Sequence, residues 1–322
     1  MRNRIMAALL GAAAALTAAS APAAAAPQFV YSPYRHLPLD GAAASANALQ
    51  GLDAKALSWA FAVGECGAET WGGQPGKAVA AAKVPQFVAA GIGYIVSTGG
   101  QGGIFTCASD EGMEKFIARY DSAHLLGFDF DIEAAQTPAQ IDSLLARLVK
   151  AQGKRPQLRF SFTVATHAAT DGSRRSLNPT SEAVLAAIRR SGLRGYVLNL
   201  MVMNYGPAGS KVCAVRGQRC DMGASAIQAV LNVHMKYLVP LEQIEVTPMI
   251  GVNDVAENVF TQSDARTVAR AVRDMKLAGL HYWSLDRDKP CGQPATGADP
   301  RCSSLPGVAA GAYGRELGKV AP

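Results

Sequence analysis

Short apolar runs alternate along this chain with segments in which apolar residues recur at helical spacing. Several of the runs are almost continuously apolar, which is typical of parallel strands that are covered on both faces. The predicted strands are Phe29–Tyr31, Leu57–Val63, Tyr94–Thr98, Leu125–Glu133, Gln157–Val164, Tyr196–Met203, Ile244–Ile250 and Leu280–Leu285.

Helical patterns occupy the gaps between these runs. Thr137-Pro138 is an N-cap followed by proline at the first helical position, and Ser263 caps a later helix. Further helices are predicted at Ala78–Ala90, Asp110–Tyr120, Ser181–Arg190, Ala224–Leu238 and Val308–Leu317.

Strands that are mostly followed by helices predict an α/β fold, a (β/α)8 TIM barrel that forms a single domain over residues 26–322. A doubly wound open sheet is the competing fold. It would prefer a glycine-rich phosphate turn after its first strand, and the sequence has none there.

The first residues have the pattern of a secretory signal peptide, predicted over residues 1–25. Arg2 and Arg4 precede the apolar stretch Met6–Ala19, and small residues follow at 21–26. The apolar run is shorter than the roughly 20 residues that span a bilayer, which disfavours an uncleaved anchor. We therefore expect a secreted or periplasmic protein that has no membrane contact after cleavage.

The even number of cysteines, six, favours disulfides in an exported chain. Cys213 with Cys220 and Cys291 with Cys302 enclose short loops, which leaves Cys66 to pair with Cys107; other pairings are open. No C-x-x-C occurs and the histidines lie far apart, so we predict no metal or other cofactor. The basic residues are scattered, which argues against nucleic acid as a partner despite a net charge of +6.

The segment Leu126–Glu133, L-G-F-D-F-D-I-E, carries three carboxylates at alternate positions. On a strand, Asp129, Asp131 and Glu133 would share one face, while the apolar residues between them face the other way. Glu133 comes at the C-terminal end of its strand, where barrel active sites lie. A solvated acidic edge or a salt-bridge cluster is the structural alternative, but the large apolar neighbours favour an internal strand and acid chemistry.

This segment resembles the signature D-x-x-D-x-D-x-E of glycoside hydrolase family 18, the chitinases and endo-β-N-acetylglucosaminidases. Asp129, Asp131 and Glu133 match the last three acids, and Leu126 replaces the first. By strand alternation, Leu126 is expected to point away from the catalytic face.

Other segments resemble the same family in the expected order, with a likeness to its bacterial branch. Ser97-Thr98-Gly99-Gly100 matches S-x-G-G, and Met203-Asn204-Tyr205-Gly206 resembles M-x-Y, with Gly206 where many members carry Asp or Asn. Trp283 lies on the eighth predicted strand, where the family places a tryptophan, and Asn253 ends a segment similar to that branch. Trp59 and Trp71 lie near the second strand, and Trp71 is open to either a cleft or a packing role.

The resemblance implies a retaining mechanism in which the substrate's own acetamido group is the nucleophile. Glu133 would be the general acid and base, Asp131 would hold the acetamido N–H, Asp129 would share a proton with Asp131, and Tyr205 would hold the acetamido oxygen. The residues expected to bind substrate are Trp283, Asn204, Met203, Ser97, Gly99 and Asn253.

The implied protein is a monomeric glycosidase of chitin or chito-oligosaccharides, polymers of β-1,4-linked N-acetylglucosamine. An endo-β-N-acetylglucosaminidase of N-glycans or peptidoglycan is the enzymatic alternative. A non-catalytic, lectin-like barrel is the binding alternative, although such members usually lack the catalytic glutamate that this chain retains at Glu133.

Overall fold

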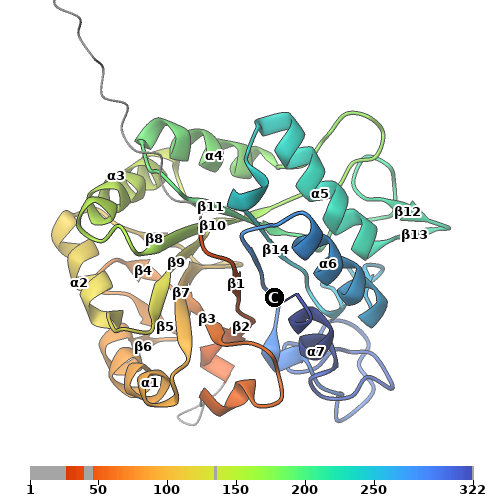
Figure 1. The fold of residues 1–322 in the computed structure, drawn as a ribbon, viewed down its shortest axis with the longest axis horizontal. Coiled ribbons are helices and arrows are strands. Elements are labelled where there is room, and N and C mark those ends of the chain that lie inside the picture. The colour runs from red at the N-terminus through yellow and green to blue at the C-terminus, as the bar shows by residue number, and fades with distance from the viewer. Residues whose placement is uncertain (1–26, 40–45, 134–135, 321–322) are drawn as a thin grey trace, which may run out of the picture.

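A parallel sheet with helices around it forms the centre of the molecule (Figure 1). The structure is a computed structural model, and it describes residues 27–39, 46–133 and 136–320. The sheet contains β1 (Val30–Tyr31), β2 (Tyr34–His36), β3 (Ala56–Ala62), β7 (Gly93–Gly99), β9 (Leu125–Asp131), β10 (Arg159–Ala165), β11 (Val197–Met201), β14 (Ile244–Thr247) and β17 (Gly279–Leu280).

The two ends of this sheet belong to one stretch of chain, residues 30–36. The strand order is β1-β17-β14-β11-β10-β9-β7-β3-β2, so β1 bonds β17 and β2 bonds β3. Between them, the Ser32 N–H donates to the Leu280 carbonyl at 3.2 Å, and the Pro33 carbonyl accepts from Ser58 at 2.9 Å. The stretch therefore serves as one strand and closes the predicted (β/α)8 barrel.

Helices enclose the barrel, as expected for βα units (Figure 1). Their bounds are α1 (Gly76–Ala90), α2 (Asp110–Tyr120), α3 (Pro138–Lys154), α4 (Pro179–Ser191), α5 (Met222–Tyr237), α6 (Gln262–Asp274) and α7 (Ala312–Gly318). Short 3-10 turns are η1 (Leu37–Leu39), η3 (Ala46–Leu49), η4 (Leu241–Gln243) and η5 (Leu285–Arg287).

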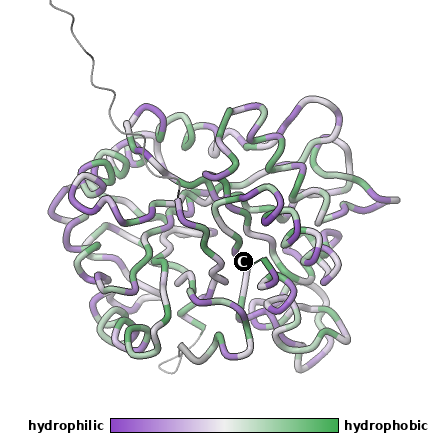
Figure 2. Tube along the Cα trace, in the orientation of Figure 1, coloured by the Kyte–Doolittle hydropathy of each residue, from purple (hydrophilic) through white to green (hydrophobic). Residues whose placement is uncertain are grey.

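Short strand pairs lie in the connections outside the central sheet. They are β4 (Gly64–Glu65) with β8 (Phe105–Thr106), β5 (Thr70–Trp71) with β6 (Gln74–Pro75), β12 (Val215–Arg216) with β13 (Arg219–Cys220), and β15 (Gly251–Val252) with β16 (Val259–Phe260). The β12–β13 hairpin projects from the body and its tip is hydrophilic (Figure 2). The β15–β16 pair follows β14 and so rises from the C-terminal end of the barrel.

One predicted helix cap is confirmed and another is wrong. The Thr137 side chain accepts from the Gln140 N–H, and Gln140 bonds back to Thr137, which makes a full capping box at the start of α3. Ser263 lies inside α6, and Thr261 is the cap there, paired with Asp264. Thr and Ser are both good N-caps, so residue type alone could not show whether Thr261 or Ser263 caps this helix.

The outer face of β9 packs against the helices, as the alternation predicted. Phe128 lies against Phe116 of α2, with ring centroids 5.0 Å apart, and Phe130 lies against Phe162 of β10 at 5.5 Å. The residues between them therefore point into the barrel, which places Asp129 and Asp131 on its inner face.

The expectation for Leu126 rested on strict alternation along the strand, and that premise is wrong. The pairing of β7 with β9 shifts register so that Tyr94 faces Leu125 and Ile95 faces Gly127, which leaves Leu126 as the extra residue of a bulge. The bulge interrupts the strict alternation on which the expectation rested. A Cβ on Gly93 would lie 3.2 Å from Leu126 Cδ1, so this side chain lies beside the start of β7, at the opposite end of the strand from Asp131.

All three predicted disulfides are present, Cys66–Cys107, Cys213–Cys220 and Cys291–Cys302. The predicted signal peptide lies outside the described residues. Within the described part of the chain, no helix combines the length and apolar character needed to cross a membrane.

Candidate active site

Three acids follow the inner face of β9 toward its C-terminal end, and together we call Asp129, Asp131 and Glu133 the carboxylate row. Asp129 and Asp131 are only 1% and 4% exposed, whereas Glu133 is half-buried just beyond the strand. Burial therefore decreases along the row toward the open end of the barrel, where a substrate could reach Glu133 first.

The innermost acid, Asp129, accepts hydrogen bonds from four hydroxyl groups. Tyr34 and Ser97 donate to Oδ2 at 2.8 and 2.6 Å. Ser161 and Thr163 donate to Oδ1 at 2.9 and 2.8 Å. Burial raises the pKa of Asp129, and these hydrogen bonds oppose that rise because they stabilise the carboxylate.

The middle acid, Asp131, has far less support. Its Oδ1 atom is buried and has no hydrogen-bond partner among the described residues. Burial raises the pKa of Asp131 well above its ordinary value, and the charges of Glu133 and Asp129 raise it further. An acid with no donor around it holds a proton readily, and its unpaired oxygen is available to a polar group of a ligand.

The outermost acid, Glu133, faces a further carboxylate that the sequence reasoning missed. Burial raises the pKa of Glu133, and the charge of Asp254 adds to the effect. Asp254 comes from the β15–β16 connection, and Asn204 Nδ2 donates to its Oδ2 at 3.0 Å. It directly follows Asn253 in the sequence, but nothing in the local pattern shows that this connection bends back over β9.

The β7 residues predicted to bind substrate lie behind the row instead. Ser97 is 0% exposed, and its hydroxyl group is bonded to Asp129. Gly99 has φ +83°, and a Cβ there would lie 2.1 Å from the Asp131 carbonyl oxygen. Ser97 and Gly99 therefore support the acid strand.

The end of β11 supplies the groups predicted from the M-x-Y resemblance. Met203 is half-buried, and Tyr205 is buried with its hydroxyl group unpartnered among the described residues. Burial raises the pKa of Tyr205, so it remains a neutral hydrogen-bond donor. Asn204 is already engaged, because its Oδ1 accepts from the Val255 N–H at 3.1 Å while its Nδ2 bonds Asp254.

Asn253 does not face the site in the way that we predicted. It is 0% exposed, and its Nδ2 donates to the carbonyls of Met249 and Gly251 at 2.8 and 3.2 Å. Its Oδ1 accepts from the Asn204 N–H at 3.2 Å. All of these partners are backbone groups, so Asn253 fixes the β15 connection against the end of β11.

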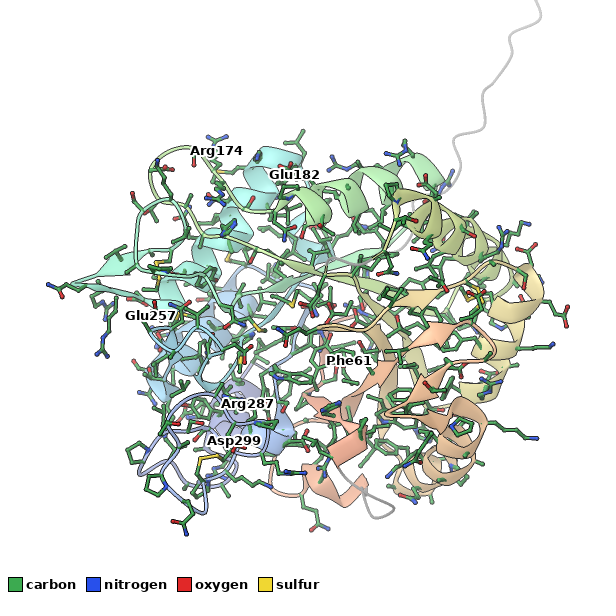
Figure 3. The ribbon with its side chains drawn as sticks, turned by 180° about the vertical axis from the view of Figure 1, so that it is seen from behind. Phe61, Arg174, Glu182, Glu257, Arg287 and Asp299 are labelled. Carbon is green, nitrogen blue, oxygen red and sulfur yellow. A yellow bond between two sulfur atoms is a disulfide. The ribbon has the colours of Figure 1, made fainter. Side chains whose placement is uncertain are left out.

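Trp283 forms an aromatic wall together with residues from the first two barrel strands. Its ring stacks on Phe61 with centroids 5.4 Å apart and an interplanar angle of 19°. The rings of His36 and Tyr34 lie 6.0 and 6.2 Å away. Phe61 was missed from the sequence; it lies near the centre of the barrel in Figure 3, and a Cβ on Gly100 would be 2.7 Å from its ring.

The other two tryptophans are packing residues. Trp59 is fully buried and stacks on Tyr94, with centroids 4.4 Å apart. Trp71 is also buried, and its indole N–H donates to the Tyr120 hydroxyl at 2.8 Å. The packing role left open for Trp71 is therefore the one observed.

A second buried acid faces the inside of the barrel near the starts of β10 and β14. Glu245 bonds the Arg159 guanidinium, and its Oε1 lies 3.1 Å from His281 Nε2. We call Arg159, Glu245 and His281 the basal cluster. Burial opposes ionisation of Glu245, but the charges of Arg159 and His281 outweigh it and lower the pKa of Glu245 to about 2.

One group of residues within the described part of the chain has the spacing of a metal site, Glu65 with Cys66 and Cys107. The two cysteines form a disulfide, so neither can provide a thiolate ligand. The side chains of the carboxylate row can themselves transfer protons and stabilise charge.

Comparisons with known proteins agree with this geometry. The chain is 28% identical over 293 residues to a probable bifunctional chitinase/lysozyme of Escherichia coli, covering 83% of this chain and 32% of the relative. It is 28% identical over 229 residues to endochitinase 11 of Metarhizium anisopliae, covering 65% of this chain and 42% of the relative. The chain thus spans about a third to two fifths of the curated relatives it matches.

The fold is that of a chitinase catalytic domain. A chitinase domain from Pyrococcus furiosus, solved in complex with chito-oligosaccharides, has a TM-score of 0.71 at 23% identity, over 92% of this chain and 96% of that one. No family model matches the sequence. The sequence relatives nevertheless carry chitinase names and the barrel matches a chitinase domain in fold, so the predicted resemblance to chitinases is confirmed.

Proposed function

We propose that this protein is a glycosidase that cleaves β-1,4 bonds of N-acetylglucosamine polymers, with chitin or chito-oligosaccharides as substrate. The observation that carries the proposal is the carboxylate row, in which burial and like charges raise the pKa of the acids toward the open end. A general acid must hold its proton at the working pH, and a raised pKa favours the protonated form of Glu133. The chitinase relatives support the same reaction.

The proposed first step breaks the glycosidic bond without an enzyme nucleophile. Glu133 gives its proton to the glycosidic oxygen, and the leaving sugar departs as an alcohol. The carbonyl oxygen of the substrate's own 2-acetamido group forms a bond to the anomeric carbon, giving an oxazolinium ion. Water then attacks the anomeric carbon and displaces the acetamido oxygen, so the oxazolinium ring opens and the acetamide is restored. The Glu133 carboxylate takes the proton from that water, which restores the acid and gives net retention of configuration.

The remaining residues are assigned to the acetamido group and the sugar ring. The unpaired Oδ1 of Asp131 would accept the acetamido N–H, and this contact becomes stronger as positive charge develops on the nitrogen. The unpartnered hydroxyl of Tyr205 would donate to the acetamido oxygen. Trp283, stacked on Phe61, would provide the apolar floor under the sugar.

Export to an oxidising compartment is part of the proposal. The three disulfides suit secretion or the periplasm, because cytosolic thiols are normally kept reduced. The N-terminal pattern of charged and apolar residues supports the same conclusion. Mass spectrometry of the exported protein would test this directly, since a mature chain that begins at Met1 would contradict it.

The central test is Glu133→Gln. The amide cannot donate the required proton, so kcat on chito-oligosaccharides should fall by about 10³-fold while the unfolding temperature is retained. Glu257→Gln is the matched control, because Glu257 is exposed on the same rim and far from Phe61 (Figure 3). If Glu133→Gln cleaves at the parent's rate, Glu133 is not the acid.

Peptidoglycan is the second candidate substrate, because one sequence relative is named a chitinase/lysozyme. Mass spectrometry of products from chitin, peptidoglycan and a high-mannose glycopeptide would separate these alternatives. Binding to chito-oligosaccharides with no product after days would favour a lectin-like barrel instead.

A further inference from the structure

Arg287 is a buried arginine that the reaction scheme does not use. It ends η5, just after Trp283, and is only 1% exposed. Its acceptors are backbone carbonyls, and within the described residues no carboxylate lies at ion-pair distance from it. Burying a guanidinium is costly unless its donors are satisfied, so the place that it holds must matter to the fold or to the site.

The guanidinium joins separate segments of the rim. Nη2 donates to the carbonyl of Ile250 at 3.0 Å and to that of Val252 at 2.6 Å, while Nη1 donates to the carbonyl of Asp299. The side chains of Arg287 and Asp299 appear next to each other in Figure 3. The Val252 N–H also donates to the carbonyl of Ser303 at 3.0 Å, and Ser303 directly follows the loop closed by the Cys291–Cys302 disulfide.

The carbonyls that Arg287 holds on this connection come shortly before Asp254, the carboxylate that faces Glu133. Ile250 and Val252 lead into Asn253 and Asp254, and Asn204 holds Asp254 from the other side at 3.0 Å. The titratable groups that act on Glu133 are Asp131 on its own strand and Asp254 from this connection. Arg287 is thus placed to fix the position of the Asp254 carboxylate.

We propose that Arg287 is a positioning residue which, by holding the carbonyls of Ile250, Val252 and Asp299, fixes Asp254 beside Glu133. The inference rests on the proposed function, because it gives Glu133 the role of acid. Lysine could keep the charge but not the planar fork of donors that reaches three carbonyls at once.

The direction of a pH shift separates positioning from a simple charge effect. If Arg287 only contributed positive charge, its removal would favour the protonated acid and move the basic limb of the kcat profile to higher pH. If its loss lets Asp254 move away, Glu133 loses a neighbouring negative charge, and the limb moves to lower pH. Asp254→Asn must also move the limb to lower pH.

The experiment compares Arg287→Met, Arg287→Lys, Asp254→Asn and the double variant Arg287→Met/Asp254→Asn. Arg301→Met is the matched control, because Arg301 is an exposed arginine in the same disulfide-closed loop. Each variant is measured for kcat against pH on a chito-oligosaccharide. Hydrogen exchange of the peptide over residues 251–258 is measured in parallel and does not depend on activity.

The expected result is a basic limb roughly half a pH unit lower in Arg287→Met, with faster exchange over residues 251–258 and no further shift in the double variant. Arg287→Lys should shift less, in the same direction, and it provides the same criteria if Arg287→Met does not fold.

A basic limb that is unchanged or at higher pH, or a shift that adds to that of Asp254→Asn, would overturn the inference. If the parent cleaves none of the substrates, the proposed function fails, and unchanged exchange in Arg287→Met would then separately refute the clamp.

Discussion

The basal cluster and the carboxylate row contain equally buried acids inside one barrel, yet their pKa values move in opposite directions. Glu245 and Asp129 are each 1% exposed. Arg159 and His281 flank Glu245, and its pKa is lowered to about 2, while hydroxyl groups and other carboxylates surround the row, whose pKa values rise. Burial alone therefore does not identify a catalytic acid; the charge of its neighbours does.

The comparison predicts opposite effects on stability when an acid is neutralised. The pKa of Asp131 is raised on folding, so its ionisation favours the unfolded chain, and stability is lost as pH rises from the unfolded value through the folded one. The pKa of Glu245 is lowered on folding. Its contribution is present above the unfolded value and is lost as pH falls toward about 2.

The largest expected effect is that of Asp131→Asn on the reaction. An amide cannot provide the negative charge that the acetamido nitrogen needs, so kcat should fall by about 10²- to 10³-fold, or about 3–4 kcal/mol of barrier. In the pH range where Asp131 ionises, the same variant should unfold at a higher temperature than the parent, because it removes an acid whose charge is buried. Thermal unfolding over a series of rising pH and initial rates would check both parts, and a variant that loses as much stability with rising pH as the parent would contradict the comparison.

Glu245→Gln should do the reverse. The amide leaves the Arg159 guanidinium buried without its counter-charge, which costs about 3 kcal/mol of unfolding free energy. Urea unfolding at pH 7 measures the loss. The folded fraction should retain the parent's pH profile on chito-oligosaccharides, because the basal cluster does not contribute to the pKa of Glu133. A shifted profile would show that the two regions are coupled.

The smallest effect is expected from Asp254→Asn. Removing this charge takes away one of the two causes that raise the pKa of Glu133, so the basic limb of kcat should move down by a few tenths to about one pH unit. Rates below that limb should change only a few-fold. If the basic limb of kcat stays at the parent's pH, the charge of Asp254 does not contribute to the raised pKa of Glu133.

The alternation of acids and aromatics along Leu126–Glu133 was enough to predict an inner and an outer face of one strand, and the order of the strands was enough for the barrel. Alternation failed at Leu126, because a bulge depends on how β7 pairs with β9, and such register is a tertiary property. Single-sequence patterns carry no information on that pairing.

The site was predictable where a residue ends a strand and less so where a connection folds back. Glu133 was predicted from its place at the end of a strand, whereas Tyr205 and Trp283 were predicted from the family resemblance, and the roles of all three stay predictions. Asp254 was missed because its approach to Glu133 depends on the path of the β15–β16 connection. Phe61 lies on β3 and was missed because its contact with Trp283 depends on how strands from the two ends of the chain meet. Asn253 and Ser97 were predicted to bind substrate because the sequence shows that their side chains are polar but does not show the protein groups to which they are hydrogen-bonded.

The closing strand at residues 30–36 also bears on how the chain acquires its fold. Its two neighbours, β3 and β17, come from near the beginning and near the end of the described chain. The ring of hydrogen bonds can be completed only after β17 has emerged from the ribosome. The partly assembled sheet has two unpaired edges until then, so chaperones that cover strand edges should matter most during that interval.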